Sequence, residues 1–130
     1  MAKYLVTGAA GFIGSSLVRA LLEGGAEVRG VDNFATGRRE NLTEVMSRID
    51  FREVDILDLE AMHAACAGID YVLHEAAIPS VPKSVLDPLG SNRANVDGTV
   101  NVLVAARDAK VKRVGVCGFV IGLWRYAYAS

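Results

Sequence analysis

The chain alternates short apolar runs with longer segments in which apolar residues recur at helical spacing. Runs rich in β-branched, aromatic and other apolar residues predict five strands, at 3–7, 27–32, 51–56, 70–77 and 112–120. Apolar residues at helical spacing predict helices over 12–22, 59–68 and 91–110. Strands that alternate with helices in this way favour right-handed crossovers. We therefore expect an α/β fold with a doubly wound parallel sheet that stops after about the fifth strand.

The remaining segments read as connections. Residues 33–49 are polar and turn-rich, and three prolines, Pro79, Pro82 and Pro88, follow the fourth predicted strand. The last predicted helix has one apolar face, formed by Val96, Val100, Leu103 and Ala106.

Composition and charge narrow the class of protein. The chain has 130 residues, which is one domain by size, and 52% of them are hydrophobic. A net charge of −1 gives no electrostatic reason to expect nucleic acid or an acidic membrane as a partner. The apolar run at 114–124 is too short to span a bilayer. Cys66 and Cys117 show no metal-binding or redox spacing, which favours buried thiols and a cytoplasmic protein.

The segment TGAAGFIGSS at 7–16 joins the first predicted strand to the first predicted helix. Gly8 permits a tight turn, Gly11 lets a pyrophosphate approach the backbone, and Gly14 lets the helix pack closely on the strand. The pyrophosphate would then lie at the helix N-terminus, where N–H groups and the helix dipole favour an anion. This context favours a dinucleotide-binding turn of the Rossmann type over a chance run of small residues.

Asp32 ends the second predicted strand, about 20 residues after the glycines. Its carboxylate can accept hydrogen bonds from a ribose 2′-OH and would repel a 2′-phosphate, which favours NAD over NADP. Two alternatives stay open at this point. Asp32 could be a strand-end turn residue, and Arg38 and Arg39 could either hold a 2′-phosphate or form a solvated loop face.

The TGxxGxxG spacing resembles the extended short-chain dehydrogenase/reductase family. Further segments that are similar to the family pattern are VDNFATGRRENL (31–42), VDILD (54–58), HEAAIPSVPKSVLDP (74–88) and NRANVDGTVNVLVAARDAKVKR (92–113). Within the family, the chain most resembles NAD-dependent UDP-sugar 4-epimerases, including those that act on UDP-N-acetylhexosamines. The resemblance covers residues 1–113 as an NAD-binding domain and leaves 114–130 as an atypical segment.

The resemblance implies an NAD site. Its residues would be Gly8, Gly11, Phe12, Ile13, Gly14, Asp32, Asn33, Thr36, Gly37, Asp55, Ile56, Ala76, Ala77 and Asn95. In that pattern Asp55 bonds the adenine amino group, Ile56 packs on the ring, and Asn95 lies near the nicotinamide. Alternatively, Asp55 caps a strand end and Asn95 bonds only to neighbouring backbone. We expect structural roles for His63 and His74.

The family's catalytic pair is not present in these residues. In the family a Tyr-x-x-x-Lys pair moves the proton of the sugar 4-OH while C4 passes a hydride to NAD. None of the 4 tyrosines here is followed by lysine at that spacing, so we assign no catalytic residue and no metal ligand. The sequence thus predicts the NAD-binding part of an epimerase, without the catalytic region or the substrate domain.

Several alternatives stay open. The chain could be a fragment, a natural NAD-binding half, or one of two chains that complete a fold. Its reaction class could instead be that of a nucleotide-sugar dehydratase or reductase, or it could be a non-catalytic NAD sensor or scaffold. A UDP-sugar would bind only a full-length version, for which the resemblance also implies a homodimer.

Overall fold

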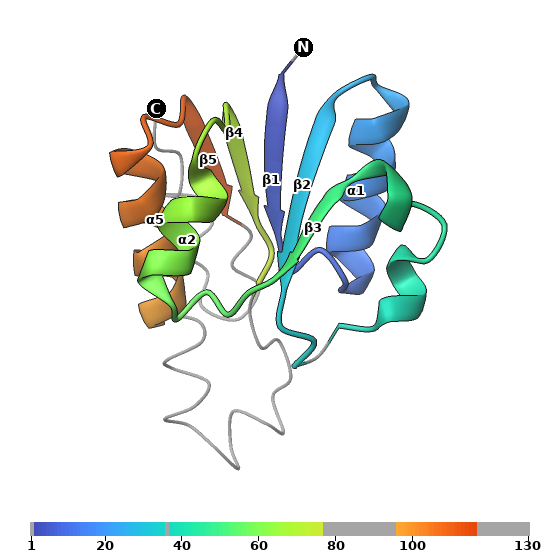
Figure 1. Ribbon diagram of the computed structural model, residues 1–130, viewed down its shortest axis with the longest axis horizontal. Coiled ribbons are helices and arrows are strands. Elements are labelled where there is room, and N and C mark those ends of the chain that lie inside the picture. The colour runs from blue at the N-terminus through green and yellow to red at the C-terminus, as the bar shows by residue number, and fades with distance from the viewer. Residues whose placement is uncertain (1, 36, 77–95, 117–130) are drawn as a thin grey trace.

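The computed structural model describes residues 2–35, 37–76 and 96–116. Five parallel strands form one sheet in the order β3-β2-β1-β4-β5. They are β1 (Lys3–Thr7), β2 (Glu27–Asp32), β3 (Asp50–Glu53), β4 (Tyr71–His74) and β5 (Arg113–Val116). All their carboxyl ends meet at one edge of the sheet, the lower edge in Figure 1. The predicted parallel α/β fold is confirmed.

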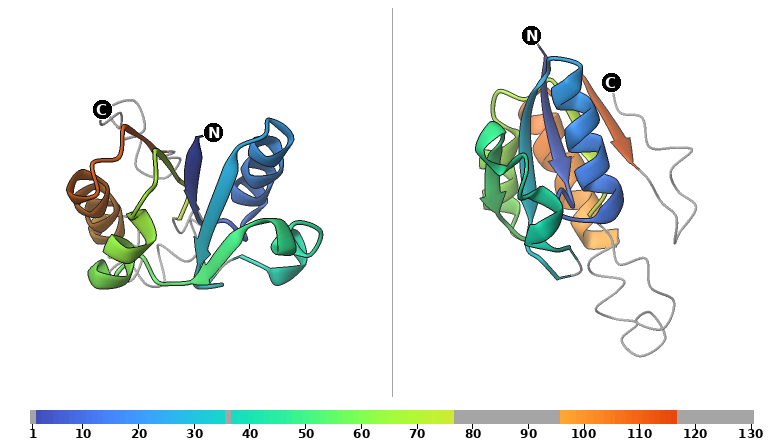
Figure 2. Two further views of the ribbon diagram at one scale, coloured as in Figure 1. Left: turned by 45° about the horizontal axis from the view of Figure 1, so that its top comes forward. Right: turned by 90° about the vertical axis from the view of Figure 1, so that its right-hand side faces the viewer.

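Helices cover both faces of this sheet. The α-helices are α1 (Phe12–Glu23), α2 (Leu59–Cys66) and α5 (Gly98–Asp108), and two short 3₁₀ helices are η1 (Arg39–Leu42) and η2 (Met46–Arg48). The helix α1 lies on one face, while α2 and α5 lie together on the other (Figures 1 and 2). The sheet is therefore doubly wound, as the strand–helix alternation predicts.

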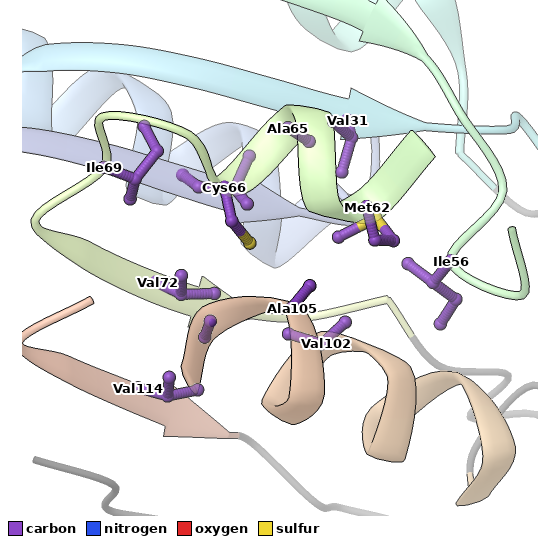
Figure 3. Packing of buried hydrophobic residues seen from close by; sticks show 12 residues of the cluster. Val31, Ile56, Met62, Ala65, Cys66, Ile69, Val72, Val102, Ala105 and Val114 are labelled. Atoms are coloured by element: carbon purple, nitrogen blue, oxygen red, sulfur yellow. The ribbon is translucent and has the colours of Figure 1, made fainter. Parts of the chain in front are cut away.

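Alternating side chains of the central strand supply the two halves of the core. Leu5 points to the face covered by α2 and α5, and Val6 points to the face covered by α1; both are fully buried. Beneath α2 and α5, Met62, Val72 and Val102 come together from three different elements (Figure 3). Because close-packed apolar side chains cover both faces of the sheet, the positions of the strand ends at its carboxyl edge are fixed.

Strand ends differ from the prediction at two places. The third strand stops at Glu53 rather than at residue 56, because Asp55 forms a turn: its Oδ1 atom accepts from the backbone N–H of Leu57 at 2.9 Å. The fourth strand stops at His74. The helix α2 then begins after Asp58, whose side chain accepts from the N–H of Ala61 at 3.1 Å as an N-cap.

The prediction of an irregular connection at 33–49 is incomplete. The helices η1 and η2 lie within it, and Leu42 and Val45 are buried against the α1 side of the sheet. Leu42, Val45, Met46 and Ile49 recur at helical spacing and pack together against the sheet, a short pattern that is easily overlooked among the surrounding polar residues.

The apolar face predicted for the last helix is also partly wrong. Val96 and Val100 are exposed, and the residues that pack against α2 and the sheet are Val102, Ala105 and Ala106. Leu103 and Ala106 of the predicted face do pack against this cluster, whereas Val102 and Ala105 take the places predicted for Val96 and Val100.

Some predictions lie outside the described residues, namely the prolines after the fourth strand, Cys117, and one end of each of three predicted elements, 70–77, 91–110 and 112–120. Cys66 is buried and forms no disulfide, and burial raises the pKa of its thiol to about 11. Within the described residues no helix has both the length and the hydropathy needed to cross a membrane.

Candidate functional site

The glycine segment forms a tight turn between β1 and α1. Gly8 has φ of 68°, in the left-handed region that favours glycine. A Cβ atom on Gly8 would lie 2.7 Å from the carbonyl carbon of Glu75 and 2.8 Å from the backbone nitrogen of Ala76. The turn thus rests directly on the segment that follows β4, and no side chain fits between them.

The first residues of α1 pack onto this turn. The backbone N–H of Gly11 donates to the carbonyl oxygen of Gly8 at 3.0 Å, and the N–H of Ser15 donates to the carbonyl oxygen of Gly11 at 2.9 Å. A Cβ atom on Gly14 would overlap the carbonyl oxygen of Gly8. Gly14 is therefore required for the close approach of helix and strand that the sequence predicts.

The N-terminus of α1 carries no acidic residue in its first turn and no side-chain cap. Its first N–H groups have no intrahelical acceptor, and the helix dipole adds a partial positive charge there. Phe12 is 83% exposed and Ile13 is 39% exposed beside these groups. This end of α1 is therefore suited to an anion such as a pyrophosphate.

Asp32 lies beside the glycine turn at the end of β2. It is 9% exposed, and its Oδ2 atom accepts from the backbone N–H of Ala10 at 2.9 Å. Its Oδ1 atom accepts from the N–H of Phe34 at 2.7 Å. A carboxylate has about four acceptor positions, so Asp32 can brace the turn and still accept from ribose hydroxyls.

A second set of contacts, not predicted from the sequence, fixes the far side of the turn. The Nδ2 atom of Asn41 donates to the carbonyl oxygen of Ala10 at 2.8 Å, and the N–H of Arg38 donates to the same oxygen at 3.0 Å. Arg19 of α1 donates to the carbonyl oxygen of Asn41 at 2.5 Å. No local periodicity in the sequence marks Asn41 for this role.

Gly37 and Asn33 lie in the loop after Asp32. A Cβ atom on Gly37 would come within 2.9 Å of both Asp32 Oδ2 and Ala10, so only glycine fits this approach. The side chain of Asn33 is exposed, and its Oδ1 atom accepts from the N–H of Ala35 at 3.0 Å. The loop therefore closes around the Asp32 carboxylate.

Asp55 and Ile56 follow β3. Asp55 is exposed and stabilises its own turn, as the alternative interpretation predicts, while Ile56 is 8% exposed. A Cβ atom on Gly98 would overlap the side chain of Ile56, and Asn101 donates to the carbonyl oxygens of Ile56 and Leu57 at 3.1 Å each. Gly98 and Asn101 of α5 thus position this segment, and sequence reasoning missed both.

A buried polar network lies behind Gly8. The Thr7 hydroxyl oxygen accepts from the N–H groups of Glu75 and Ala76, at 3.1 and 3.2 Å. It lies 2.5 Å from Nδ1 of His74, whose Nε2 atom lies 2.9 Å from the hydroxyl oxygen of Thr99. Burial lowers the pKa of His74 to about 4, so the ring is neutral at pH 7. His74 has the structural role that we expected, as a support for Ala76.

The described members of the predicted site lie around one edge of the sheet. These are Gly8, Gly11, Phe12, Ile13, Gly14, Asp32, Asn33, Gly37, Asp55, Ile56 and Ala76, all at or just after the carboxyl ends of β1 to β4. Thr36, Ala77 and Asn95 lie outside the described residues. Among the residues that the structure does describe, no group of three or more His, Cys, Asp or Glu side chains is arranged to hold a metal ion.

An open hollow adjoins this edge beside the carboxyl ends of β2 and β3. Its volume is about 510 Å³, and its lining is formed by Phe34, Gly37, Arg38, Arg39, Glu40 and Glu53. It begins at the loop that closes around Asp32. Ligands of open α/β sheets bind outside the carboxyl ends of the strands, where this hollow lies.

Comparison with known proteins agrees with this geometry. The family model described as the NAD dependent epimerase/dehydratase family matches residues 4–118. The UDP-glucose 4-epimerase of Mycolicibacterium smegmatis is 43% identical over 115 residues, which are 86% of this chain and 37% of that protein. The cinnamoyl-CoA reductase 2 of Medicago truncatula is 38% identical over 114 residues, which are 84% of this chain and 32% of that protein.

A solved structure shares the fold over the same region. The UDP-glucose 4-epimerase of Thermus thermophilus, crystallised as a complex with NAD, superposes with a TM-score of 0.79 at 42% identity. The match covers 86% of this chain and 36% of that one. The chain therefore spans about a third of the length of these relatives, between 32% and 37%.

Proposed function

Because the chain belongs to the NAD dependent epimerase/dehydratase family, we propose that it is the NAD-binding portion of a nucleotide-sugar 4-epimerase. One observation carries the proposal: Asp32 is bonded through Ala10 to the glycine turn at the N-terminus of α1. This arrangement puts an anion site and a hydroxyl acceptor side by side. A dinucleotide needs both, one for its pyrophosphate and one for its adenosine ribose.

The residues present fit NAD. Side chains at Gly8 and Gly14 would collide with backbone atoms, so glycine is needed at both positions. The N-terminus of α1 beside them has no side-chain cap, and its N–H groups can bind a phosphate. Asp32 beside it carries a negative charge, which suits two ribose hydroxyls and opposes a 2′-phosphate. The prediction of NAD is confirmed at the level of the family, whose description names this cofactor.

When bound, NAD supplies a reversible hydride acceptor. The chain's own residues bind and orient it: α1 holds the pyrophosphate, Asp32 holds the ribose, and Ile56 provides an apolar contact for the adenine. The 130 residues contain no Tyr-x-x-x-Lys pair. We therefore expect this chain to bind NAD without epimerising a sugar, and a UDP-sugar to bind only together with further residues.

Isothermal titration calorimetry with NAD and NADP tests the proposal. The informative variant is Gly11→Ala, because Gly11 has φ of −73°, which any residue adopts, and its new Cβ would meet the carbonyl oxygen of Gly8 at 3.3 Å, a tight contact that a small shift can relieve. The added methyl group would obstruct a pyrophosphate, so we expect an NAD affinity at least about tenfold weaker with only a small fall in melting temperature. Gly24→Ala, at the other end of α1 with φ of −78°, is the matched control. Absence of heat with both dinucleotides on the wild type would refute the proposal.

A second candidate is the cofactor portion of a reductase of the same family. The observation that favours it is the 38% identity to cinnamoyl-CoA reductase 2 of Medicago truncatula. Activity assays on a longer protein, with nucleotide sugars and with acyl-CoA substrates, would separate the two candidates. Four further points remain predictions: a dehydratase activity, a role as a non-catalytic sensor or scaffold, a cytoplasmic location, and a homodimer of the longer protein.

A further inference from the structure

Two carboxylates stand next to each other at the carboxyl edge of the sheet. Asp32 of β2 and Glu53 of β3 are register partners, and the N–H of Val54 donates to the carbonyl oxygen of Asp32 at 3.2 Å. Asp32 faces the glycine turn, whereas Glu53 lines the open hollow. The adenosine end of the proposed dinucleotide site is therefore bordered by two acidic residues.

Arg39 is held between Glu53 and an aromatic ring. Its Nη2 atom lies 2.8 Å from Oε1 of Glu53, and its guanidinium carbon lies 4.2 Å from the centre of the Phe34 ring. Phe34 has φ of 60°, and its N–H donates to Asp32 Oδ1 at 2.7 Å. The contacts thus run from Asp32 through Phe34 and Arg39 to Glu53, around one side of the hollow.

This arrangement bears on the choice between NAD and NADP, which differ by a phosphate on the adenosine ribose. A protein that binds a 2′-phosphate commonly uses an arginine near the end of the second strand. Arg39 has the charge and is near this position, but its guanidinium is already paired with Glu53 and stacked on Phe34.

We propose that Glu53 is a second determinant of NAD selectivity, which acts by engaging Arg39, the arginine that could otherwise bind a 2′-phosphate. The proposal rests on the proposed function, because it assumes that the adenosine ribose lies at Asp32. The pair is exposed, with side-chain exposure of 65% for Arg39 and 59% for Glu53. The effect of this ion pair on cofactor affinity is therefore moderate, and it decreases as salt screens the charges.

Calorimetric titration of Glu53→Gln with both dinucleotides tests the proposal. Glutamine has the shape of glutamate without its charge, so Arg39 becomes available to a 2′-phosphate. We expect the affinity for NADP to rise about three- to fivefold at low salt, the affinity for NAD to change less than about twofold, and the gain to shrink at high salt. Glu27→Gln is the matched control, since Glu27 pairs with Lys3 at 3.6 Å at the opposite end of β2.

The double variant Glu53→Gln/Arg39→Ala identifies the group that binds the phosphate. If Arg39 supplies the charge, the double variant loses the gain in NADP affinity that the single variant shows. A gain that survives removal of Arg39, or an unchanged NADP-to-NAD ratio in Glu53→Gln, would overturn the proposal. Failure of the wild type to bind NAD would instead overturn the proposed function, so the two failures are distinguishable.

Discussion

The Nδ1 atom of His74 lies 2.5 Å from the hydroxyl oxygen of Thr7, although 67 residues separate them along the chain. The Thr7 oxygen already accepts from the N–H groups of Glu75 and Ala76, so its own proton must go to Nδ1. The proton of the neutral ring is then on Nε2, which donates to Thr99. This tautomer ties β1, β4 and α5 together directly behind the glycine turn.

Replacement of Thr7 by valine tests this hydrogen-bond network. Valine has nearly the same shape but leaves His74 Nδ1 without its donor and the N–H of Ala76 without its acceptor, whereas the N–H of Glu75 keeps the backbone carbonyl oxygen of Thr7 at 3.1 Å. We expect the free energy of unfolding to fall by about 1–3 kcal/mol in urea denaturation. NAD affinity should fall as well, because Glu75 and Ala76 form the floor of the turn at Gly8. Thr7→Ser restores the hydroxyl, and a serine variant as weak as the valine variant would contradict the assignment.

His74 should make the free energy of unfolding depend on pH. Folding lowers its pKa from 6.5 to about 4, so between these values the unfolded chain binds a proton that the folded chain does not. The free energy of unfolding therefore falls as the pH drops through this window, by at most about 3 kcal/mol.

Denaturation curves at several pH values, on wild type and His74→Gln, measure this contribution. We expect a flatter profile for the variant between pH 6.5 and about 4. Asp70 and Asp108 act at lower pH: bonds from the Lys3 backbone N–H and from His63, respectively, hold their pKa values below 3.8. Parallel profiles for the two proteins above pH 4 would rule out a buried neutral histidine.

Replacement of Asp32 by alanine should change the choice of cofactor. Loss of the hydrogen bonds from the ribose to a charged acceptor should weaken NAD binding by about 10- to 100-fold. NADP should lose less, because the repulsion of its 2′-phosphate disappears at the same time. Titration with both dinucleotides gives the ratio, and Asp32→Asn serves as the variant that keeps the shape of the side chain. Equal losses for NAD and NADP would remove the role assigned to Asp32.

Replacement of Gly98 by alanine should destabilise the fold through one contact. The new methyl group would overlap the side chain of Ile56, and such overpacking costs about 1–3 kcal/mol. In the background Ile56→Ala the overlap is absent, so the same glycine substitution should be nearly neutral there. A double-mutant cycle by urea denaturation measures the coupling. Additive effects would show that Gly98 and Ile56 do not contact each other.

The sequence predicted those features that depend on local pattern. β1 and β2 match the predicted bounds, because β1 is a run of β-forming residues that ends at Gly8 and β2 starts soon after the glycines that end α1. The roles of Gly8 and Gly14 were predictable too, since their spacing encodes a turn geometry that only glycine permits.

The sequence could not predict features that depend on distant partners. Asn41 and Asn101 each brace a site loop, but their acceptors lie 31 and at least 44 residues away in the chain. The exposure of Val100 follows from which row of α5 meets α2, and periodicity in a single helix does not fix that row. Arg39 reads as a solvated residue until β3 brings Glu53 beside it.

Backbone atoms of Glu75 and Ala76 lie directly against the glycine turn, and this placement bears on how the site is completed as the chain folds. The elements β1, α1 and β2 lie close together in sequence and can pair early, during synthesis or folding. Their loop gains its final shape only when β4 docks on the other side of β1. A dinucleotide that binds this loop therefore binds only the sheet in which β4 is paired with β1. By mass action, it stabilises that pairing.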